Sequence, residues 1–456
     1  MITNRILLAS VFLLAACVSS ADKPGTPPGI VGASSVEIVS DQGRYHLLVN
    51  GEPFVVKGVG LSYSGGERMR ALKAAGGNSF RTWHADKLDR ELALAKSLGL
   101  MVAVGLDTGK ELQGFDYNDE RKVLEQYKRI TAYIDRYKNH PNVLCWVIAN
   151  EPNLLFDEEG KLKDVNPKVY DALADIVDYI HETDPNHPVT FALAGASKKH
   201  IDMTLERVPQ IDFVSVQVYG DLAILGDTLE SLKLDKPFMV TEFGPKGHWE
   251  VPATSWGREI EEPSGPKAAG MASRMEANIV HDKTGKIIGS FAFLWGQKQE
   301  RTPTWYGMFN ENGEQTARID ELTRIWTGSY PDNRAPLTDS ITLNGKRPRD
   351  SVTLQAGKDS IARLVVSDPD GDVLTTDWRI MQEVETRSQG GHFEAKPKSL
   401  PVNVSKVTRG KTTDNKGFVE IEFKAPVQLG EYRLFSYSVD GHQHVANANI
   451  PFKVIN

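Results

Sequence analysis

Two glutamates stand where a pair of carboxyl groups could do chemistry. Glu151 follows the apolar run 143–149, and Glu242 ends the apolar part of the run 238–243. Cleavage of a glycosidic bond needs one carboxylic acid that protonates the leaving oxygen and one carboxylate that attacks or stabilises the anomeric carbon. In a retaining site the two groups are ~5–5.5 Å apart, so ionisation of one raises the pKa of the other and their roles separate.

Other polar and aromatic residues end apolar runs in the same part of the chain. A carboxylate that stays ionised needs a positive charge and hydrogen-bond donors beside it, and Arg81 and Tyr219 are the candidate donors. Each of these residues alone has a structural explanation, such as an ion pair, a helix cap or core packing. Their combination favours a site. The residues expected around the two glutamates are Arg81, Trp83, His84, Asn150, Tyr219 and Trp295.

The elements that must position these residues are short apolar runs that alternate with helix-like stretches between residues 54 and 326. This alternation is typical of βα units around a parallel sheet, and eight runs are the number that closes a (β/α)8 TIM barrel. In such a barrel the active site lies at the C-terminal ends of the strands, where the residues above fall. The predicted strands are 54–59, 79–83, 101–106, 143–149, 189–193, 213–219, 238–243 and 287–294.

A doubly wound sheet with a nucleotide site is the rival fold. The sequence disfavours it, because Gly58-Val59-Gly60 lacks the third glycine of a dinucleotide fingerprint and position 63 is Tyr63. The stretch 105–110 is one residue too short for a phosphate-binding P-loop. Glycosidic cleavage by two carboxyl groups needs neither an organic cofactor nor a metal ion, and we expect none.

Two further segments flank the predicted barrel. Residues 36–56 contain short strands around turn signals, a hairpin pattern that precedes the first barrel strand. After a Pro-rich linker, the chain from residue 337 onward alternates apolar and polar residues without a strong helical stretch, as in an antiparallel sandwich. The predicted fold is therefore α/β: a TIM barrel over residues 36–330, followed by a small all-β, immunoglobulin-like sandwich over 337–456.

The N-terminus has the pattern of a secretory signal. Residues 1–16 hold one arginine and then an apolar run that is well short of the ~20 residues needed to span a bilayer. The run ends in Leu14-Ala15-Ala16-Cys17, which resembles the bacterial lipobox and implies cleavage before Cys17 and a lipid on its thiol. An ordinary secretory signal with a chance cysteine is the alternative. The same resemblance points to the outer membrane or periplasm of a Gram-negative cell, with 17–35 as a flexible tether.

The charge and the cysteine content of the chain limit the classes of molecule that we expect it to bind. The 456 residues include 53 Lys and Arg and 60 Asp and Glu, for a net charge of −7, so no basic face suggests a nucleic acid. The two cysteines, Cys17 and Cys145, cannot build a disulfide framework, and Cys145 is expected to be a buried, inert thiol. We expect a carbohydrate as partner, contact with a membrane through the N-terminal lipid only, and leave the oligomeric state open.

Two features outside the glutamate pair also suggest binding. The stretch 245–264 is long for a barrel loop and contains Trp249 and Trp256, whose rings could stack on sugars or simply pin the loop. In the sandwich, an acidic turn could hold Ca²⁺, although a plain turn is the commoner case. His442 and His444 lack a third metal ligand. The carboxylates of that turn belong to Asp368, Asp370 and Asp372.

The residues around the glutamates resemble the catalytic domain of glycoside hydrolase family 2 and, more loosely, family 5, in the barrel clan of retaining glycosidases. The similar stretches are Asn78 to His84, Trp146 to Glu151 and Thr241 to Gly244. The resemblance covers roughly residues 45–326. It implies that Glu151 is the acid/base and Glu242 the nucleophile, and that Asn150 contacts the sugar 2-hydroxyl. It also makes Tyr219 the tyrosine beside the nucleophile and Trp295 the platform under the first sugar.

The departures from that family leave the substrate open. Only a tether and a hairpin precede the barrel, in place of the galactose-binding-like and immunoglobulin-like domains usual in family 2, so its specificity is not carried over. The stretch 78–82 is also similar to β-1,3-glucanosyltransferases. We expect a retaining hydrolase of β-glycosidic bonds in an oligo- or polysaccharide, acting by double displacement. A β-glucan transglycosylase and a non-catalytic surface glycan-binding lipoprotein are the alternatives, and the sugar, the linkage and endo or exo action stay open.

Overall fold

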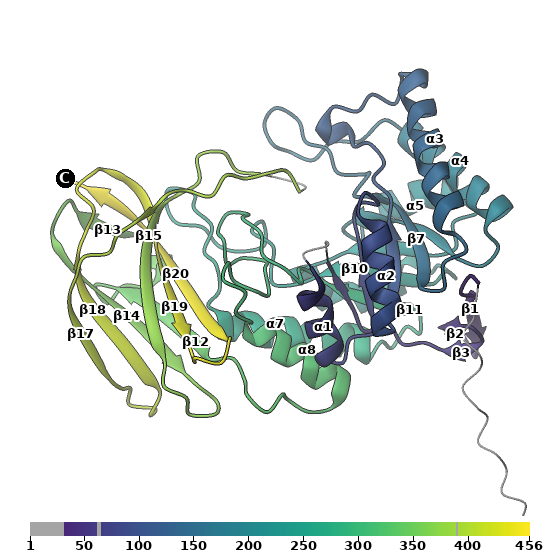
Figure 1. Ribbon diagram of the computed structural model, residues 1–456. Helices are drawn as coiled ribbons and strands as arrows, with labels where there is room; N and C mark the ends of the chain where they lie inside the picture. The colour runs from purple at the N-terminus through teal and green to yellow at the C-terminus, as the bar shows by residue number, and fades with distance from the viewer. Residues whose placement is uncertain (1–31, 62–64, 389–390) are drawn as a thin grey trace, which may run out of the picture.

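The computed structural model describes residues 32–61, 65–388 and 391–456. The chain forms a closed barrel of eight parallel strands and, beside it, a two-sheet β domain (Figure 1). The predicted TIM barrel and the following all-β domain are confirmed. The barrel strands are β4 (Gly58–Gly60), β5 (Ser79–Arg81), β6 (Met101–Gly105), β7 (Val143–Asn150), β8 (Val189–Ala194), β9 (Val214–Gln217), β10 (Phe238–Phe243) and β11 (Ile287–Ala292).

Each barrel strand overlaps a predicted apolar run, and the first differs most from its prediction. We expected a strand over 54–59, but the N–H of Phe54 donates to the carbonyl of Leu47 at 2.8 Å and so belongs to the leading hairpin. At Gly60 the chain needs glycine because a Cβ there would lie 2.7 Å from the ring of Trp83. This glycine therefore serves close packing beneath a site residue rather than a phosphate loop.

Helices between the strands cover the outside of the barrel. The side chain of Asp119 accepts a hydrogen bond from the N–H of Lys122 and caps α3 (Glu120–Tyr137), and α2 (Leu88–Leu98) ends at Gly99, whose φ is 64°. The α-helices are α1 (Gly66–Ala74), α2 (Leu88–Leu98), α3 (Glu120–Tyr137), α4 (Lys168–Thr183), α5 (Lys198–Arg207), α6 (Leu225–Leu232), α7 (Ser264–Met275) and α8 (Ala317–Thr327). Short 3₁₀ or π turns occupy η1 (Glu111–Gln113), η2 (Gly220–Ile224), η3 (Glu276–Val280) and η4 (Pro348–Asp350).

The hairpin closes the floor of the barrel, the end opposite the C-terminal ends of the strands. It consists of β1 (Val36–Asp41), β2 (Arg44–Val49) and β3 (Glu52–Pro53) in one antiparallel sheet. Val36 and Leu47 pack with Met101 and Leu144, which start or lie early in barrel strands. Cys145 belongs to the same cluster, and burial raises the pKa of its thiol to about 12, as expected of an inert cysteine.

The C-terminal domain is a sandwich of two sheets around its own apolar core. Its sheets have the strand orders β12-β14-β18-β17 and β13-β20-β19-β15-β16, and every pairing is antiparallel except that of β13 with β20. The strands are β12 (Leu337–Leu343), β13 (Val352–Gln355), β14 (Asp359–Ser367), β15 (Thr375–Gln382), β16 (Ser399–Leu400), β17 (Val404–Lys411), β18 (Gly417–Lys424), β19 (Gly430–Val439) and β20 (Val445–Ile455).

A buried polar interface joins the sandwich to the barrel. The hydroxyl of Ser264, the first residue of α7, lies 2.9 Å from that of Thr338 on β12. From β20, Asn449 Nδ2 donates to Glu261 Oε2 at 2.6 Å, and Glu261 also pairs with Lys267 inside α7. Buried polar groups that are all paired hold one arrangement, so these bonds fix how the two domains sit.

Most of the predictions about the N-terminus concern residues that the structure does not describe. The predicted signal segment, Cys17 and the tether up to residue 31 lie outside the described residues. Within the described residues, no helix combines the length and the apolar character needed to cross a membrane.

Candidate active site

A cavity of about 1230 Å³ opens at the C-terminal ends of the barrel strands, an end we call the mouth. The structure brings the predicted site residues together here. Arg81 lies behind the cavity wall and reaches the site through hydrogen bonds. The predicted residues that border the cavity are Trp83, His84, Asn150, Glu151, Tyr219, Glu242 and Trp295.

Glu242, on β10, is surrounded by hydrogen-bond donors. Its Oε1 accepts from Arg81 Nη1 at 2.9 Å, Trp83 Nε1 at 2.8 Å and Gln217 Nε2 at 3.0 Å. Its Oε2 accepts from the hydroxyl of Tyr219 at 2.9 Å. The residue is only 5 % exposed. Four donors, one of them a guanidinium, therefore hold the Glu242 side chain in one orientation.

Arg81 ties the strands of the site together. The residue is fully buried, and its guanidinium donates to Glu242 Oε1, to the carbonyl of Thr241 at 3.0 Å and to Asn150 Oδ1 at 2.6 Å. Burial lowers the pKa of Arg81, and the charges of Glu242 and Glu151 oppose that shift. A planar guanidinium with fixed donors holds both neighbours in one geometry.

Gln217, on β9, is a site residue that sequence reasoning missed. It is 3 % exposed, and its Nε2 donates to Asn150 Oδ1 at 2.6 Å as well as to Glu242. Since Arg81 and Gln217 both donate to Asn150 Oδ1, the amide nitrogen of Asn150 is the end left for the cavity. The available signal was position, because Gln217 precedes Tyr219 by two residues and so shares its side of the chain.

Glu151 has a different environment from Glu242. It follows β7 with a φ of 52°, in the left-handed region that is uncommon for a residue with a Cβ. Burial raises its pKa, and the charges of Glu242 and Glu300 raise it further, whereas Lys110 Nζ, 3.6 Å from Glu151 Oε2, acts in the opposite direction. The net direction is upward, so Glu151 keeps its proton to a higher pH than an ordinary glutamate.

Glu300 is another carboxylate that borders the cavity, and sequence reasoning missed it as well. It is 7 % exposed and lies in the loop between β11 and α8. Burial alone would raise its pKa, but His248 at 3.6 Å and Lys298 at 2.5 Å outweigh burial and lower the pKa. Glu300 is therefore a negative charge near Glu151.

The aromatic residues differ in the ring surface that they offer to the cavity. Trp249 is 61 % exposed, borders the cavity and packs edge-to-face on Tyr219, with ring centroids 5.5 Å apart. Trp295 also borders the cavity but is 0 % exposed, with its N–H donated to the carbonyl of Arg68 at 2.9 Å. Trp256 does not border it. Trp249 thus presents the most open ring, and the role of Trp295 as a sugar platform stays a prediction.

His84 lies at the rim rather than beside the glutamates. Its side chain is 62 % exposed and pairs with Asp107 at 3.5 Å. A hydrogen bond to Asp107 raises the pKa of His84, and burial acts against it. Its predicted contact with substrate stays a prediction.

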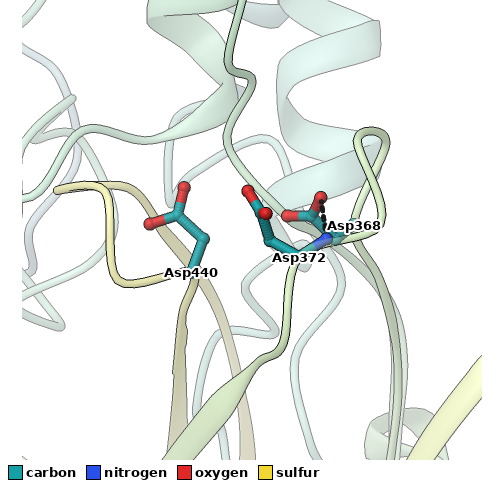
Figure 2. Close-up of side chains that lie close together, drawn as sticks. All are labelled: Asp368, Asp372 and Asp440. Atoms are coloured by element: carbon teal, nitrogen blue, oxygen red, sulfur yellow. Dashed lines mark hydrogen bonds between the residues drawn. The ribbon is translucent and has the colours of Figure 1, made fainter.

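The acidic turn of the sandwich gathers a different set of carboxylates from the expected one. Figure 2 shows Asp368 and Asp372 beside Asp440. One carboxylate oxygen of each residue lies within 4.8 Å of the others. Asp370 instead accepts a hydrogen bond from the backbone N–H of Arg334 at 2.6 Å. Oδ1 of Asp368 accepts from the N–H groups of residues 370 and 372, which is the bonding of an acidic turn. None of these carboxylates borders the cavity at the mouth.

A parallel eight-stranded barrel with two unequal glutamates at its mouth is the arrangement of the barrel glycosidases. Residues 66–249 match the model of the glycosyl hydrolases family 2 TIM barrel domain. Over these residues the barrel of this chain is similar to the barrel domain of that family.

Curated relatives agree with that family. A β-glucuronidase of Streptococcus agalactiae is 28 % identical over 268 residues, which cover 49 % of this chain and 42 % of that protein. A β-glucuronidase of Sus scrofa is 24 % identical over 206 residues, covering 41 % and 28 % respectively. The chain spans less than half the length of these relatives.

A solved structure with similar architecture is the β-glucuronidase from Ruminococcus gnavus in complex with D-glucaro 1,5-lactone. Its TM-score is 0.50 at 19 % identity, over 65 % of this chain and 53 % of that one. This likeness concerns the fold alone.

Proposed function

We propose that this protein is a retaining β-glycosidase in which Glu151 is the acid/base and Glu242 the nucleophile. The observation that carries the proposal is the contrast between the two carboxyl groups. Glu242 accepts four hydrogen bonds, one of them from a buried arginine, whereas burial raises the pKa of Glu151. Two carboxyl groups with such different environments can act as a charged nucleophile and a protonated acid.

The hydrogen bonds also suggest which oxygen attacks. Oε1 of Glu242 accepts three hydrogen bonds, and Oε2 accepts one, from Tyr219. Oε2 therefore has the free lone pair, and in the first step it bonds to the anomeric carbon while Glu151 gives its proton to the departing glycosidic oxygen. In the second step Glu151 takes a proton from water, and the water oxygen displaces Glu242 from the sugar. The amide nitrogen of Asn150 donates to the sugar 2-hydroxyl.

For the substrate we propose a β-linked glycan of more than one sugar. Cavities that hold small ligands are typically about 300–1,000 Å³, and the cavity here is about 1230 Å³. The matched relatives are β-glucuronidases, so a β-glucuronide is the second candidate. Transfer to a sugar acceptor instead of water uses the same residues and would give products longer than the substrate.

The test is a substrate panel followed by product analysis. Purified protein is incubated with 4-nitrophenyl β-glucoside, β-galactoside, β-mannoside and β-glucuronide, and with β-glucan, mannan and galactan, and product lengths are measured by mass. We expect cleavage of at least one compound with the β-anomer as first product by NMR. An α-anomer as first product would refute the retaining mechanism. Tight glycan binding without any cleavage would favour the glycan-binding alternative.

We also propose that the mature protein is held at a Gram-negative membrane by a lipid on Cys17. The support is the sequence alone, in which small residues and the cysteine fall together at the end of the apolar run. Expression of the full chain with a radiolabelled fatty acid should label the protein, and Cys17→Ala should remove the label. Equal labelling of the variant would contradict the proposal.

A further inference from the structure

The cavity at the mouth is not formed by the barrel alone. Arg387 and Gly391, which belong to the sandwich loop between β15 and β16, border the same cavity as Glu151 and Glu242. Figure 1 shows this yellow-green loop reaching from the sandwich toward the barrel. A part of the C-terminal domain therefore faces the space where a glycan would lie.

Arg387 is bound to the barrel loop between β10 and α7. Its Nη2 donates to the carbonyl of Gly257 at 2.7 Å, and its Nη1 lies 3.3 Å from Glu259 Oε1. The same barrel loop carries Trp249, the most exposed ring in the cavity. The side chain of Arg387 is still 36 % exposed, so part of its guanidinium is available to a ligand.

A buried ion pair fixes the loop behind Arg387. Arg301, 6 % exposed, donates to the carbonyl of Ser388 at 2.8 Å and lies 3.3 Å from Glu394 Oε2. Glu394 is 4 % exposed and accepts a further hydrogen bond from the N–H of Ser388 at 2.9 Å. A wall that is fixed in advance loses little entropy when a ligand binds.

The start of the loop is fixed as well. Arg258 of the barrel donates to the carbonyl of Val384 at 3.0 Å and pairs with Glu431 of β19 at 2.6 Å. Beside it, the buried Arg433 pairs with Glu383 at 2.9 Å. Both sides of Arg387 are thus attached to the barrel or to the sandwich core.

We propose that the sandwich completes the substrate cleft and that Arg387 binds sugar units beyond the one held at the two glutamates. This inference rests on the proposed glycosidase function. Because Arg387 and Arg301 share the carboxylates of Glu259 and Glu394, the charges of this cluster balance, and the guanidinium of Arg387 donates to hydroxyl groups instead of neutralising an acidic sugar. The cavity is bordered by as many Lys and Arg as Asp and Glu residues. The ligand that fits is a neutral, β-linked oligosaccharide.

The test compares short and long substrates of one sugar. Wild type and Arg387→Ala are assayed on the 4-nitrophenyl β-glycoside that wild type cleaves fastest and on the matching oligosaccharides of two to six units. Loss of a hydrogen bond to ligand should raise KM for the hexasaccharide roughly 5- to 20-fold with kcat little changed. KM for the aryl monosaccharide should not change.

Two further variants separate a binding role from a structural one. Arg409→Ala removes an exposed arginine of β17, on the sandwich but away from the cavity, and should leave both KM values unchanged. Arg387→Lys keeps a donor and should restore part of the hexasaccharide affinity. An equal change for aryl monosaccharide and hexasaccharide in Arg387→Ala, or no change for either, would overturn the inference.

Failure of the proposed function is distinguishable from failure of this inference. If wild type cleaves no compound, the function fails, and calorimetric titration of wild type and Arg387→Ala with cello-, laminari- and mannohexaose still tests the cleft. Weaker binding by the variant supports the inference. Equal binding, no binding of any hexasaccharide, or binding of 4-nitrophenyl β-glucuronide in preference to all three would overturn it.

Discussion

The mouth and the floor of the barrel each hold a buried network of residues that are capable of chemistry. At the mouth, donors surround Glu242. At the floor, Ser34 Oγ lies 3.0 Å from His187 Nε2, and His187 Nδ1 lies 2.8 Å from Asp184 Oδ2. The floor network has the residue types and the distances of a hydrolase triad.

The two networks differ in access and in what remains unbonded. Ser34, His187 and Asp184 are 0 %, 3 % and 2 % exposed, and none borders the cavity at the mouth. The Ser34 hydroxyl already donates to the carbonyl of Val143 at 2.6 Å, so its proton is not directed at a base that could activate the hydroxyl. The floor network therefore fastens the N-terminal segment to the barrel. A set of residues with the types of a catalytic site indicates a reaction only where the residues border a cavity and the attacking atom has a lone pair that no hydrogen bond occupies.

The largest expected effect is the loss of activity in Glu242→Gln, a substitution in the network at the mouth. Glu242→Gln removes the proposed nucleophile but keeps the shape of the side chain, so kcat should fall at least about 10³-fold. Initial rates on the best aryl glycoside measure it, and thermal melting should show a folded protein. A rate within tenfold of wild type would remove Glu242 from the mechanism.

Gln217→Leu should give the next largest effect. The substitution removes a hydrogen bond to the charged Glu242, and such bonds contribute about 1.5–3 kcal/mol, which corresponds to a roughly 10- to 150-fold lower kcat. Gln217 also orients Asn150, whose proposed hydrogen bond to the sugar 2-hydroxyl strengthens in the transition state. The substitution should therefore change kcat more than KM. Gln217→Glu, which places a second charge beside Glu242, should be at least as damaging. Normal kcat in Gln217→Leu would show that Arg81 alone suffices to position both residues.

At the floor, His187→Ala should affect stability instead of rate. The change leaves the carboxylate of Asp184, 2 % exposed, without one of its partners, and an unsatisfied buried group costs about 1–3 kcal/mol. Urea denaturation measures the loss in the free energy of unfolding, with kcat at low urea as the second readout. Ser34→Ala is the milder control. A large fall in kcat at unchanged stability would contradict the structural role of the floor.

Much of the mouth could be predicted because its residues end apolar strands. In a parallel barrel every strand begins at the floor and ends at the mouth, so Arg81, Asn150, Glu151 and Glu242 converge once the strands are recognised. Their clustering follows from topology and needs no knowledge of side-chain contacts. The hairpin was also predictable, since its turns carry local signals.

The missed residues depend on neighbours that are distant in sequence. Gln217 is one polar residue among apolar ones, and its importance comes from Asn150 and Glu242 on other strands. Arg387 lies in another domain, and no local pattern places it at the mouth. The difference in exposure between Trp249 and Trp295 likewise results from packing in three dimensions. Local periodicity identifies elements but does not record such contacts.

The charges around Glu151 offer a finer test of the mouth. The rate should fall at high pH when Glu151 loses its proton, and its raised pKa places this limb above the range of an ordinary glutamate. Lys110→Met removes a charge that lowers this pKa, so the basic limb should move to higher pH. Glu300→Gln removes a charge that raises it, so the limb should move to lower pH.

The measurement is kcat/KM against pH for both variants and for Lys406→Met, an exposed cation of β17 that serves as control. Opposite shifts for the two variants, with none for the control, are the expected result. Shifts in the same direction would mean that the basic limb belongs to another group than Glu151.

The smallest effect should appear at the rim, where the mouth network ends. The His84 side chain is 62 % exposed and pairs with Asp107, which is 46 % exposed. Exposed ion pairs contribute about 0.2–1 kcal/mol, so His84→Ala should change KM by less than about fivefold. Steady-state rates on the best aryl glycoside and on its oligosaccharides measure this change, and Asp107→Asn serves as the matched variant. A loss of 100-fold in kcat would place His84 against the reacting sugar. The rim of the mouth would then be as sensitive to substitution as the buried residues around Glu242.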